Sequence, residues 1–193
     1  NGMMTPTLKI RRHAVLRVHG NTSAMTQFLP DDVASFQEAN QQVRIVLQEC
    51  WSDEAVRRVR AGEAELGVVV EGCDVQGLWC RPYRTDRLSA VMRATDPLSG
   101  PEIAFAELLE RDLVGLEGNS TLTRLITAQA ALQMKPMALR VQVRSFEAVC
   151  RAVVAELGVG ILPLAAAQSF VHDLRLKVIP LSDEWALRRM HLC

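Results

Sequence analysis

The stretch SFEAVCRAVVAELGVGILP, residues 145–163, carries the clearest pattern in the chain. Apolar side chains recur there at helical spacing: Phe146, Val149, Cys150, Val153, Val154 and Leu157. This spacing predicts an amphipathic helix, with Ser145 as its N-terminal cap and Gly158 at its end. The apolar run from Val159 to Leu164 then predicts a buried strand. A helix that leads directly into a buried strand is typical of an α/β fold with a parallel sheet.

The N-terminal part alternates strands and helices in the same way. Strands are predicted at 15–20, 43–50 and 65–70, with helices between them. Asn21, Thr22 and Ser23 are good caps for the first helix, and Ser52 is a good cap for the second. Pro30 falls inside the first helical pattern, so we expect a kink or a restart there. The order strand-helix-strand-helix-strand implies a parallel sheet with right-handed crossovers.

A second unit follows an irregular or extended stretch at 72–87. Its expected strands are 88–94, 113–116, 139–144 and 159–164, and its expected helices are 102–111, 121–134 and 146–157. A short helix at 165–170 and strands at 174–180 and 187–193 complete the chain. We therefore predict two Rossmann-like lobes of parallel-rich sheet flanked by helices, with a ligand cleft between them. Lobe I would comprise 14–70 plus 165–193, the crossover 71–87, and lobe II 88–164.

The composition excludes several classes of protein. Lys+Arg and Asp+Glu number 22 each, and this balance argues against nucleic-acid binding by the chain alone. The five cysteines are odd in number and lack CxxC spacing, so we expect reduced thiols in a cytoplasmic protein rather than a zinc site or disulfide framework. Cys50 and Cys150 lie in apolar patterns, as small core residues do. No signal peptide or membrane-spanning stretch is visible.

Enzyme signatures are absent from the sequence. It contains no GxSxG, HExxH or Walker motif, and its four histidines are scattered. His19 ends the first strand and could face a cleft, but a structural role is the better interpretation. We therefore expect no enzyme activity, no cofactor and no bound metal.

Polar residues gather where predicted strands give way to helices. Ligands of open α/β sheets bind at these carboxyl ends of strands. Four junctions stand out: Asn21-Thr22-Ser23, Cys50-Trp51-Ser52, Gly118-Asn119-Ser120-Thr121 and Arg144-Ser145-Phe146. Each could be an ordinary helix cap, but four helix N-termini facing one cleft would suit an anion such as a carboxylate. Trp51 could stack on an apolar ligand or fill the cleft, and both alternatives stay open.

The order of these motifs resembles that of LysR-type effector-binding domains. LRVHG at 16–20, followed by a polar cap and FLP at 28–30, is similar to the opening of that family. VRAGEAELGV at 59–68 and DPL at 96–98 are similar to two further motifs. The most recognisable match is the helix at 145–157 that runs into GVGILP at 158–163. The resemblance covers 16–193, nearly the whole chain.

The resemblance implies a fold like that of type 2 periplasmic binding proteins and a sensor for a bacterial transcription regulator. A small carboxylate or other anion would bind between the lobes and modulate DNA binding and transcription. By position, the effector contacts would be Asn21, Thr22, Ser23, Trp51, Ser52, Asn119, Ser120, Thr121, Ser145 and Phe146. The domains would pair through the helices at 25–40 and 146–157, with Met25, Phe28, Leu29, Val33, Val149 and Val153 at the interface.

The resemblance also implies a homodimer, which becomes a tetramer in the complete regulator. DNA would be bound only through an N-terminal helix-turn-helix, and this chain lacks one. Two other departures are the absence of a helix after the last strand and the presence of Trp51 where the family usually has a small polar residue. The main alternative is a solute-binding protein of a transporter, which shares the fold but requires export.

Overall fold

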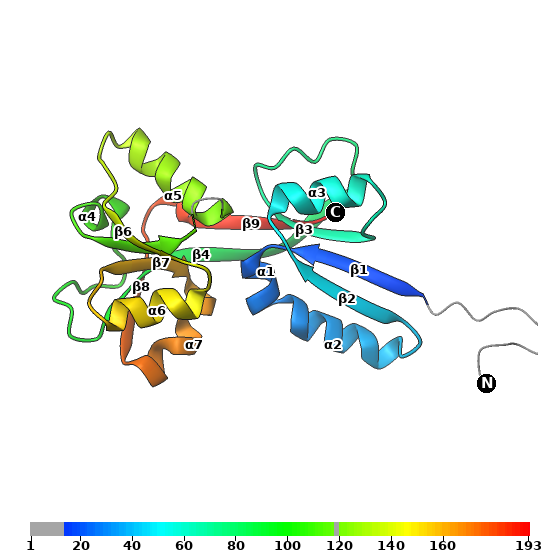
Figure 1. Ribbon diagram of the computed structural model, residues 1–193, viewed down its shortest axis with the longest axis horizontal. Coiled ribbons are helices and arrows are strands. Elements are labelled where there is room, and N and C mark those ends of the chain that lie inside the picture. The colour runs from blue at the N-terminus through cyan, green and yellow to red at the C-terminus, as the bar shows by residue number, and fades with distance from the viewer. Residues whose placement is uncertain (1–13, 118–119) are drawn as a thin grey trace, which may run out of the picture. The chain divides into compact units, whose positions relative to one another are not determined.

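The computed structural model describes residues 14–117 and 120–193 and divides into two compact units (Figure 1). Unit 1 contains the described residues up to Arg81 together with Leu192 and Cys193, and unit 2 runs from Pro82 to His191. The chain leaves unit 1 at the start of strand β4 (Arg81–Arg93) and returns at the end of strand β9 (Leu187–Leu192). Among the described residues, no helix is long and apolar enough to cross a membrane.

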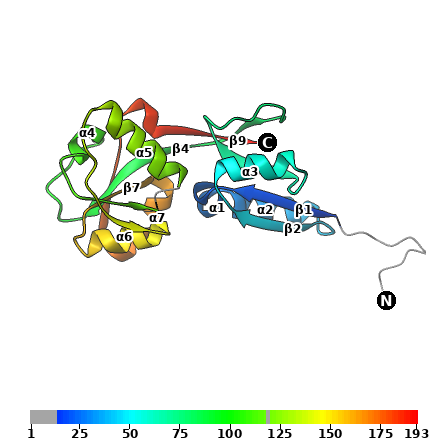
Figure 2. The same ribbon diagram turned by 45° about the horizontal axis from the view of Figure 1, so that its top comes forward.

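The strands of unit 1 are parallel, as predicted. Strand β1 (Val15–Gly20) lies between β2 (Arg44–Glu49) and β3 (Leu66–Val70), and Figure 2 shows β1 and β2 side by side. On the far side of β3, the backbone of Cys193 exchanges two hydrogen bonds of 2.8 Å with Gly67. The chain therefore returns to the first unit only with its last two residues.

The helices of unit 1 lie on both sides of these strands. Helix α3 (Ser52–Arg60) packs on β3, whereas α1 (Thr22–Gln27) and α2 (Leu29–Ala39) lie on the opposite side (Figure 1). The predicted restart near Pro30 is confirmed, because α1 ends before Phe28 and the proline occupies the first turn of α2. Proline is tolerated there because the first turn needs no intrahelical donor.

The sheet of unit 2 combines parallel and antiparallel strands. Strand β5 (Leu113–Leu116) runs parallel to β6 (Leu139–Val143) and to β7 (Val159–Pro163). Strand β4 runs antiparallel to β7 and also to β8 (Leu176–Pro180). The order from β4 is β7, β5 and β6, so β6 is an edge strand.

Helices α4 (Phe105–Leu108), α5 (Thr121–Leu132), α6 (Phe146–Val154) and α7 (Leu164–Leu174) flank this sheet, and a short 3₁₀ helix (Glu184–Ala186) precedes β9. Four members of the predicted apolar face of α6 are buried in the core of unit 2, namely Phe146, Val149, Cys150 and Val153, whereas Val154 is 40% exposed. A Cβ atom on Gly160 would lie 2.7 Å from Val149 Cγ1, so the glycine allows α6 to approach β7 closely. Gly158 adopts a φ of +146° at the turn between them.

Three predicted elements differ from the structure because distant segments pair with them. Strand β4 starts at Arg81 rather than at 88, since its first half lies beside β9. Helix α4 is much shorter than 102–111, because Ile103 pairs with Leu181 instead of joining the helix. Residues 165–191 belong to unit 2 rather than to the first lobe. There α7 packs on α6, and β8 pairs with β4.

The expectation of five reduced thiols is wrong. Cys80 and Cys193 form a disulfide, although 113 positions separate them in the sequence. The pairing of Cys193 with Gly67 and the start of β4 at Arg81 bring their Cα atoms to 4.1 Å. Spacing along the chain cannot reveal such a contact, because it depends on where β9 joins the sheet.

Candidate effector-binding residues in each unit

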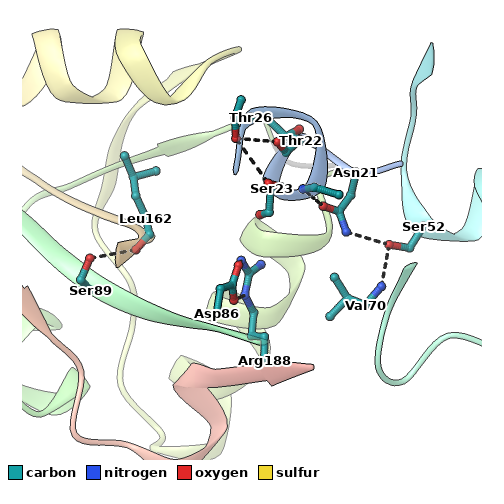
Figure 3. A network of polar contacts seen from close by, with 11 residues as sticks. Asn21, Thr22, Ser23, Thr26, Ser52, Val70, Asp86, Ser89, Leu162 and Arg188 are labelled. Atoms are coloured by element: carbon teal, nitrogen blue, oxygen red, sulfur yellow. Dashed lines mark hydrogen bonds and ion pairs between the residues drawn. The ribbon is translucent and has the colours of Figure 1, made fainter. Parts of the chain in front are cut away.

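In unit 1, polar side chains meet where the parallel strands end (Figure 3). Asn21 follows β1 and caps α1, with its Oδ1 accepting a hydrogen bond of 2.9 Å from the backbone N–H of Ala24. Its Nδ2 lies 3.5 Å from Oγ of Ser52, the first residue of α3. That hydroxyl oxygen also accepts a bond of 3.2 Å from the backbone N–H of Val70, at the end of β3. The predicted junctions after β1 and β2 are therefore one connected group.

The other predicted residues of unit 1 have different surroundings. Thr22 donates a hydrogen bond of 2.6 Å to Glu49 at the end of β2. Ser23 and Ser52 are buried, and Ser52 is 0% exposed, so its hydroxyl holds Asn21 and β3 in place. Trp51 is 49% exposed at the start of α3, and its indole is therefore accessible to a ligand.

In unit 2, two helix caps follow neighbouring strands. Strands β5 and β6 pair through Leu116 and Val143, so both carboxyl ends lie at one edge of the sheet. Ser120 Oγ accepts a bond of 3.0 Å from the N–H of Thr123 and thereby caps α5. Ser145 Oγ accepts a bond of 3.2 Å from the N–H of Ala148 and caps α6. Both predicted caps are confirmed as caps.

Two side chains carry buried polar atoms that have no hydrogen-bond partner within the described part of the chain. One is the hydroxyl of Thr121, in the first turn of α5, and the other is the amide of Gln27, at the end of α1. Buried polar atoms are almost always satisfied by protein, water or ligand, so both atoms are candidates for ligand contact. Thr121 is one of the contacts predicted from the sequence, whereas Gln27 is not, because it stands within an otherwise ordinary helical pattern.

Several residues predicted for effector contact or for the dimer interface are buried or lie outside the described residues. Asn119 lies outside the described residues. Phe146 is 4% exposed and packs in the core of unit 2, which leaves only its backbone for effector contact. Among the predicted interface residues, Leu29, Val149 and Val153 are buried inside their own units, whereas Met25, Phe28 and Val33 are partly exposed. Phe36 on α2 and Val154 on α6, about 40% exposed, are the apolar residues that these helices present instead.

A buried ion pair in unit 2 also escaped sequence analysis. Asp86 of β4 accepts a bond of 2.8 Å from Nε of Arg188 on β9, and a second guanidinium nitrogen contacts its other carboxylate oxygen (Figure 3). The two side chains are only 2% and 4% exposed. They stand 102 positions apart and have no spacing signal in the sequence.

Two of the described thiols outside the disulfide are poor nucleophiles at neutral pH. Burial raises the pKa of Cys50 to about 11 and that of Cys150 to about 11, so both stay protonated at neutral pH. Cys50 Sγ lies 3.7 Å from Nδ1 of His19, which is 2% exposed. In the described ranges, no three His, Cys, Asp or Glu side chains gather as metal ligands do.

Comparison with known proteins adds a family and a fold. A family model described as "LysR substrate binding domain" matches residues 11–193. The regulatory domain of CcmR from Synechocystis, solved in complex with 2-PG, is 19% identical with a TM-score of 0.79, over 93% of this chain and 86% of that one. The effector-binding domain of QuiR, solved with shikimate, is 15% identical with a TM-score of 0.78, over 94% and 87%.

Full-length BenM, in an E226K mutant, is 17% identical with a TM-score of 0.81. The match covers 96% of this chain but only 63% of BenM. No curated protein matches the chain in sequence. The TM-scores show a shared fold with these structures, and the family model matches nearly the whole chain.

Proposed function

Because the chain belongs to the LysR substrate-binding-domain family, we propose that it binds a small carboxylate or a similar anion as the sensing domain of a transcription regulator. The predicted effector contacts supply the polar groups for this binding. We place the regulator in the cytoplasm and assign the chain no catalytic role. DNA would be bound by a helix-turn-helix elsewhere in the full-length regulator.

The observation that carries this proposal is the buried Thr121 hydroxyl, which has no partner in the described ranges. It stands in the first turn of α5, directly after the Ser120 cap. The other hydroxyls nearby are engaged: Ser120 donates to Thr123 Oγ1 at 2.8 Å, and Thr123 donates to the carbonyl of Leu116 at 2.9 Å. A ligand oxygen would satisfy the Thr121 hydroxyl.

An anion is the class of ligand that suits the surroundings of Thr121. The N-terminal turns of α5 and α6 follow adjacent strands, and their backbone N–H groups carry partial positive charge. Ser120 and Ser145 satisfy one N–H each, which leaves others available. In unit 1 we propose effector contacts at Asn21, Thr22, Ser23, Trp51 and Ser52, with Gln27 added.

The first test is a thermal-shift screen of the chain against small carboxylates, including shikimate and 2-PG. A ligand at about 100 times its dissociation constant adds about 2.7 kcal/mol of stability. For a chain of this length, that corresponds to a rise of roughly 5 to 11 °C.

The second step is titration calorimetry of the best ligand with Thr121→Val, which removes the hydroxyl and keeps the branched shape. A lost hydrogen bond to a charged group should weaken binding about tenfold or more. Thr127→Val, at an exposed position of the same helix, is the matched control and should bind as the wild type does. Equal affinity of Thr121→Val and wild type would overturn this placement of the site.

The second part of the proposal is pairing of two copies of the chain. Helix α2 and strand β2 expose Phe36, Val46 and Leu47, each 37–41% exposed, and α6 exposes Val154 at 40%. Strand β2 is also an edge of the sheet order. We assign these residues to the dimer interface together with Met25, Phe28 and Val33. Effector binding would then act by changing how the copies pair.

A further inference from the structure

Four of the five cysteines belong to one apolar cluster in unit 1 or pack against it. The buried members of this cluster are Ala55, Val56, Val69 and Cys193, with Cys50, Cys73 and Cys80 packed against them. Cys80 and Cys193 are joined as a disulfide. Unit 1 therefore holds an oxidised pair beside two thiols.

The disulfide joins the two segments in which the chain leaves unit 1 and returns to it. Cys80 immediately precedes β4, which carries the chain into unit 2. Cys193 immediately follows β9, which brings it back. The bond thus ties the end of the loop 71–80 to the residue that pairs with Gly67 of β3.

The two bonded cysteine residues differ in exposure. Cys193 is 7% exposed, whereas Cys80 is partly exposed and follows Trp79, which is 76% exposed. An incoming thiolate therefore meets Cys80 first.

The thiol of Cys50 is poorly suited to open this bond from within. Burial raises the pKa of Cys50 to about 11, so at neutral pH it stays almost wholly protonated. Protonated thiols are not nucleophiles. A thiolate from solution that meets the partly exposed Cys80 avoids this obstacle.

We propose that the Cys80–Cys193 disulfide is an exchange site for low-molecular-weight thiols such as glutathione. A thiolate attacks Sγ of Cys80 and forms a mixed disulfide, while the sulfur–sulfur bond breaks and Cys193 leaves as a thiolate that takes a proton from water. A second thiolate attacks the outer sulfur of the mixed disulfide, and Cys80 leaves as a thiolate that also takes a proton from water. Two molecules of thiol become one disulfide, and the protein gains two thiols through two electrons and two protons.

This inference rests on the proposed function, because that function places the chain in the cytoplasm. Disulfides there are usually transient, catalytic or redox-sensing rather than structural. Opening the bond would release the loop 71–80 from the end of β9, while the two backbone bonds between Gly67 and Cys193 remain. Unit 1 would thereby acquire a second, looser form.

The test is to equilibrate the full chain in native buffers with varied ratios of reduced to oxidised glutathione. Each sample is acid-quenched, unfolded and alkylated, and its thiols are located by peptide mass spectrometry. Three alkylated cysteines (Cys50, Cys73 and Cys150) should become five as the ratio rises, with Cys80 and Cys193 changing together. In Cys193→Ser, glutathione should attach to Cys80. Cys50→Ala, the matched control, should keep the transition of the bonded pair.

Two outcomes would overturn the inference. Five alkylated cysteines even in fully oxidised glutathione would mean that the bond does not form. A bond that survives every ratio in the native state and opens only in denaturant would be purely structural. The ligand screen, repeated on the Cys80→Ser/Cys193→Ser variant, separates the two proposals, because effector binding there without a redox transition leaves the sensing function intact.

Discussion

At the scale of single residues, His19 is the buried base of unit 1. Burial lowers its pKa below the ordinary value, and the nearby positive charge of Arg58 lowers it further. The carboxylates of Glu54, Glu63 and Glu65 act in the opposite direction but are outweighed. The imidazole therefore resists protonation in the folded state more than it does in the unfolded state.

This difference predicts a loss of stability in mild acid. Above the unfolded pKa of about 6.5, His19 is neutral in both states, and its contribution is fully present. As the pH falls below this value, the unfolded state takes up the proton first, so the free energy of unfolding decreases until the folded pKa is passed. One proton gives a slope of at most about 1.4 kcal/mol per pH unit. Urea unfolding between pH 7.5 and 5 measures this slope.

The variant His19→Gln should show a shallower decrease than the wild type over this range. His172→Gln provides the matched control, because the His172 side chain is fully exposed. Its slope should follow that of the wild type. Parallel slopes for wild type and His19→Gln would show that His19 is not the group responsible.

A site residue could be predicted from the sequence where its role depends on neighbouring positions, and not where it depends on packing. Ser120 and Ser145 were identified as caps because capping depends on a few neighbouring positions. Thr121 was predicted as a contact, but the lack of a hydrogen-bond partner for its hydroxyl and for the Gln27 amide could not be predicted, because it depends on everything packed around these atoms. Phe146 is buried because it lies on the apolar face by which α6 was recognised. It also directly follows the cap Ser145, so a residue at the start of a helix can belong to the core instead of contacting a ligand.

At the scale of elements, the Asp86–Arg188 pair joins β4 to β9. Both side chains are almost fully buried, and the carboxylate receives two contacts from one guanidinium. Two such charges are tolerated in the interior because each compensates the other. The pair therefore holds together the strands that connect the two units in the chain.

Breaking this pair should be costly. Asp86→Asn removes the negative charge that the buried Arg188 guanidinium contacts at both carboxylate oxygens, and we expect a loss of about 3 to 5 kcal/mol in the free energy of unfolding. Asp112→Asn, in the exposed Arg140–Asp112 pair, is the control and should cost less than about 1 kcal/mol. Urea denaturation followed by circular dichroism measures both. A loss for Asp86→Asn no larger than for the control would contradict the structural role of the pair.

Prediction at the scale of elements succeeded where the signal was local. Strand β1 was predicted with its observed bounds, and β7 within one residue, because buried runs and flanking glycines mark them. The first half of β4 and the shortness of α4 could not be predicted, since both depend on pairing with residues more than 75 positions away. The start of α7 was predicted one residue late, because Leu164 both ends the apolar run of β7 and begins the helix.

At the scale of the whole molecule, the exposed apolar surface of α2 and β2 predicts self-association. Phe36→Glu places a charge where we expect a second copy to pack, and it should weaken dimerisation about tenfold or more. Sedimentation velocity over a range of concentrations measures the shift toward monomer.

The control for this experiment is Trp79→Glu, which introduces the same charge at an exposed aromatic residue outside α2, β2 and α6. It should leave the monomer–dimer balance as it is in the wild type. If the two variants dissociate equally, or if the wild type is monomeric at all concentrations, the proposed interface would be rejected.

The division of the chain also has a consequence for the order of folding. Unit 2 is one continuous segment, 82–191, so all of its contacts become available once residue 191 has left the ribosome. Unit 1 begins earlier but needs Leu192 and Cys193, and its Gly67–Cys193 pairing closes a loop of more than 120 residues. Such distant contacts form slowly. The half that is synthesised first is therefore the half that is completed last, and until then the outer edge of β3 is left open to a chaperone or to another nascent chain.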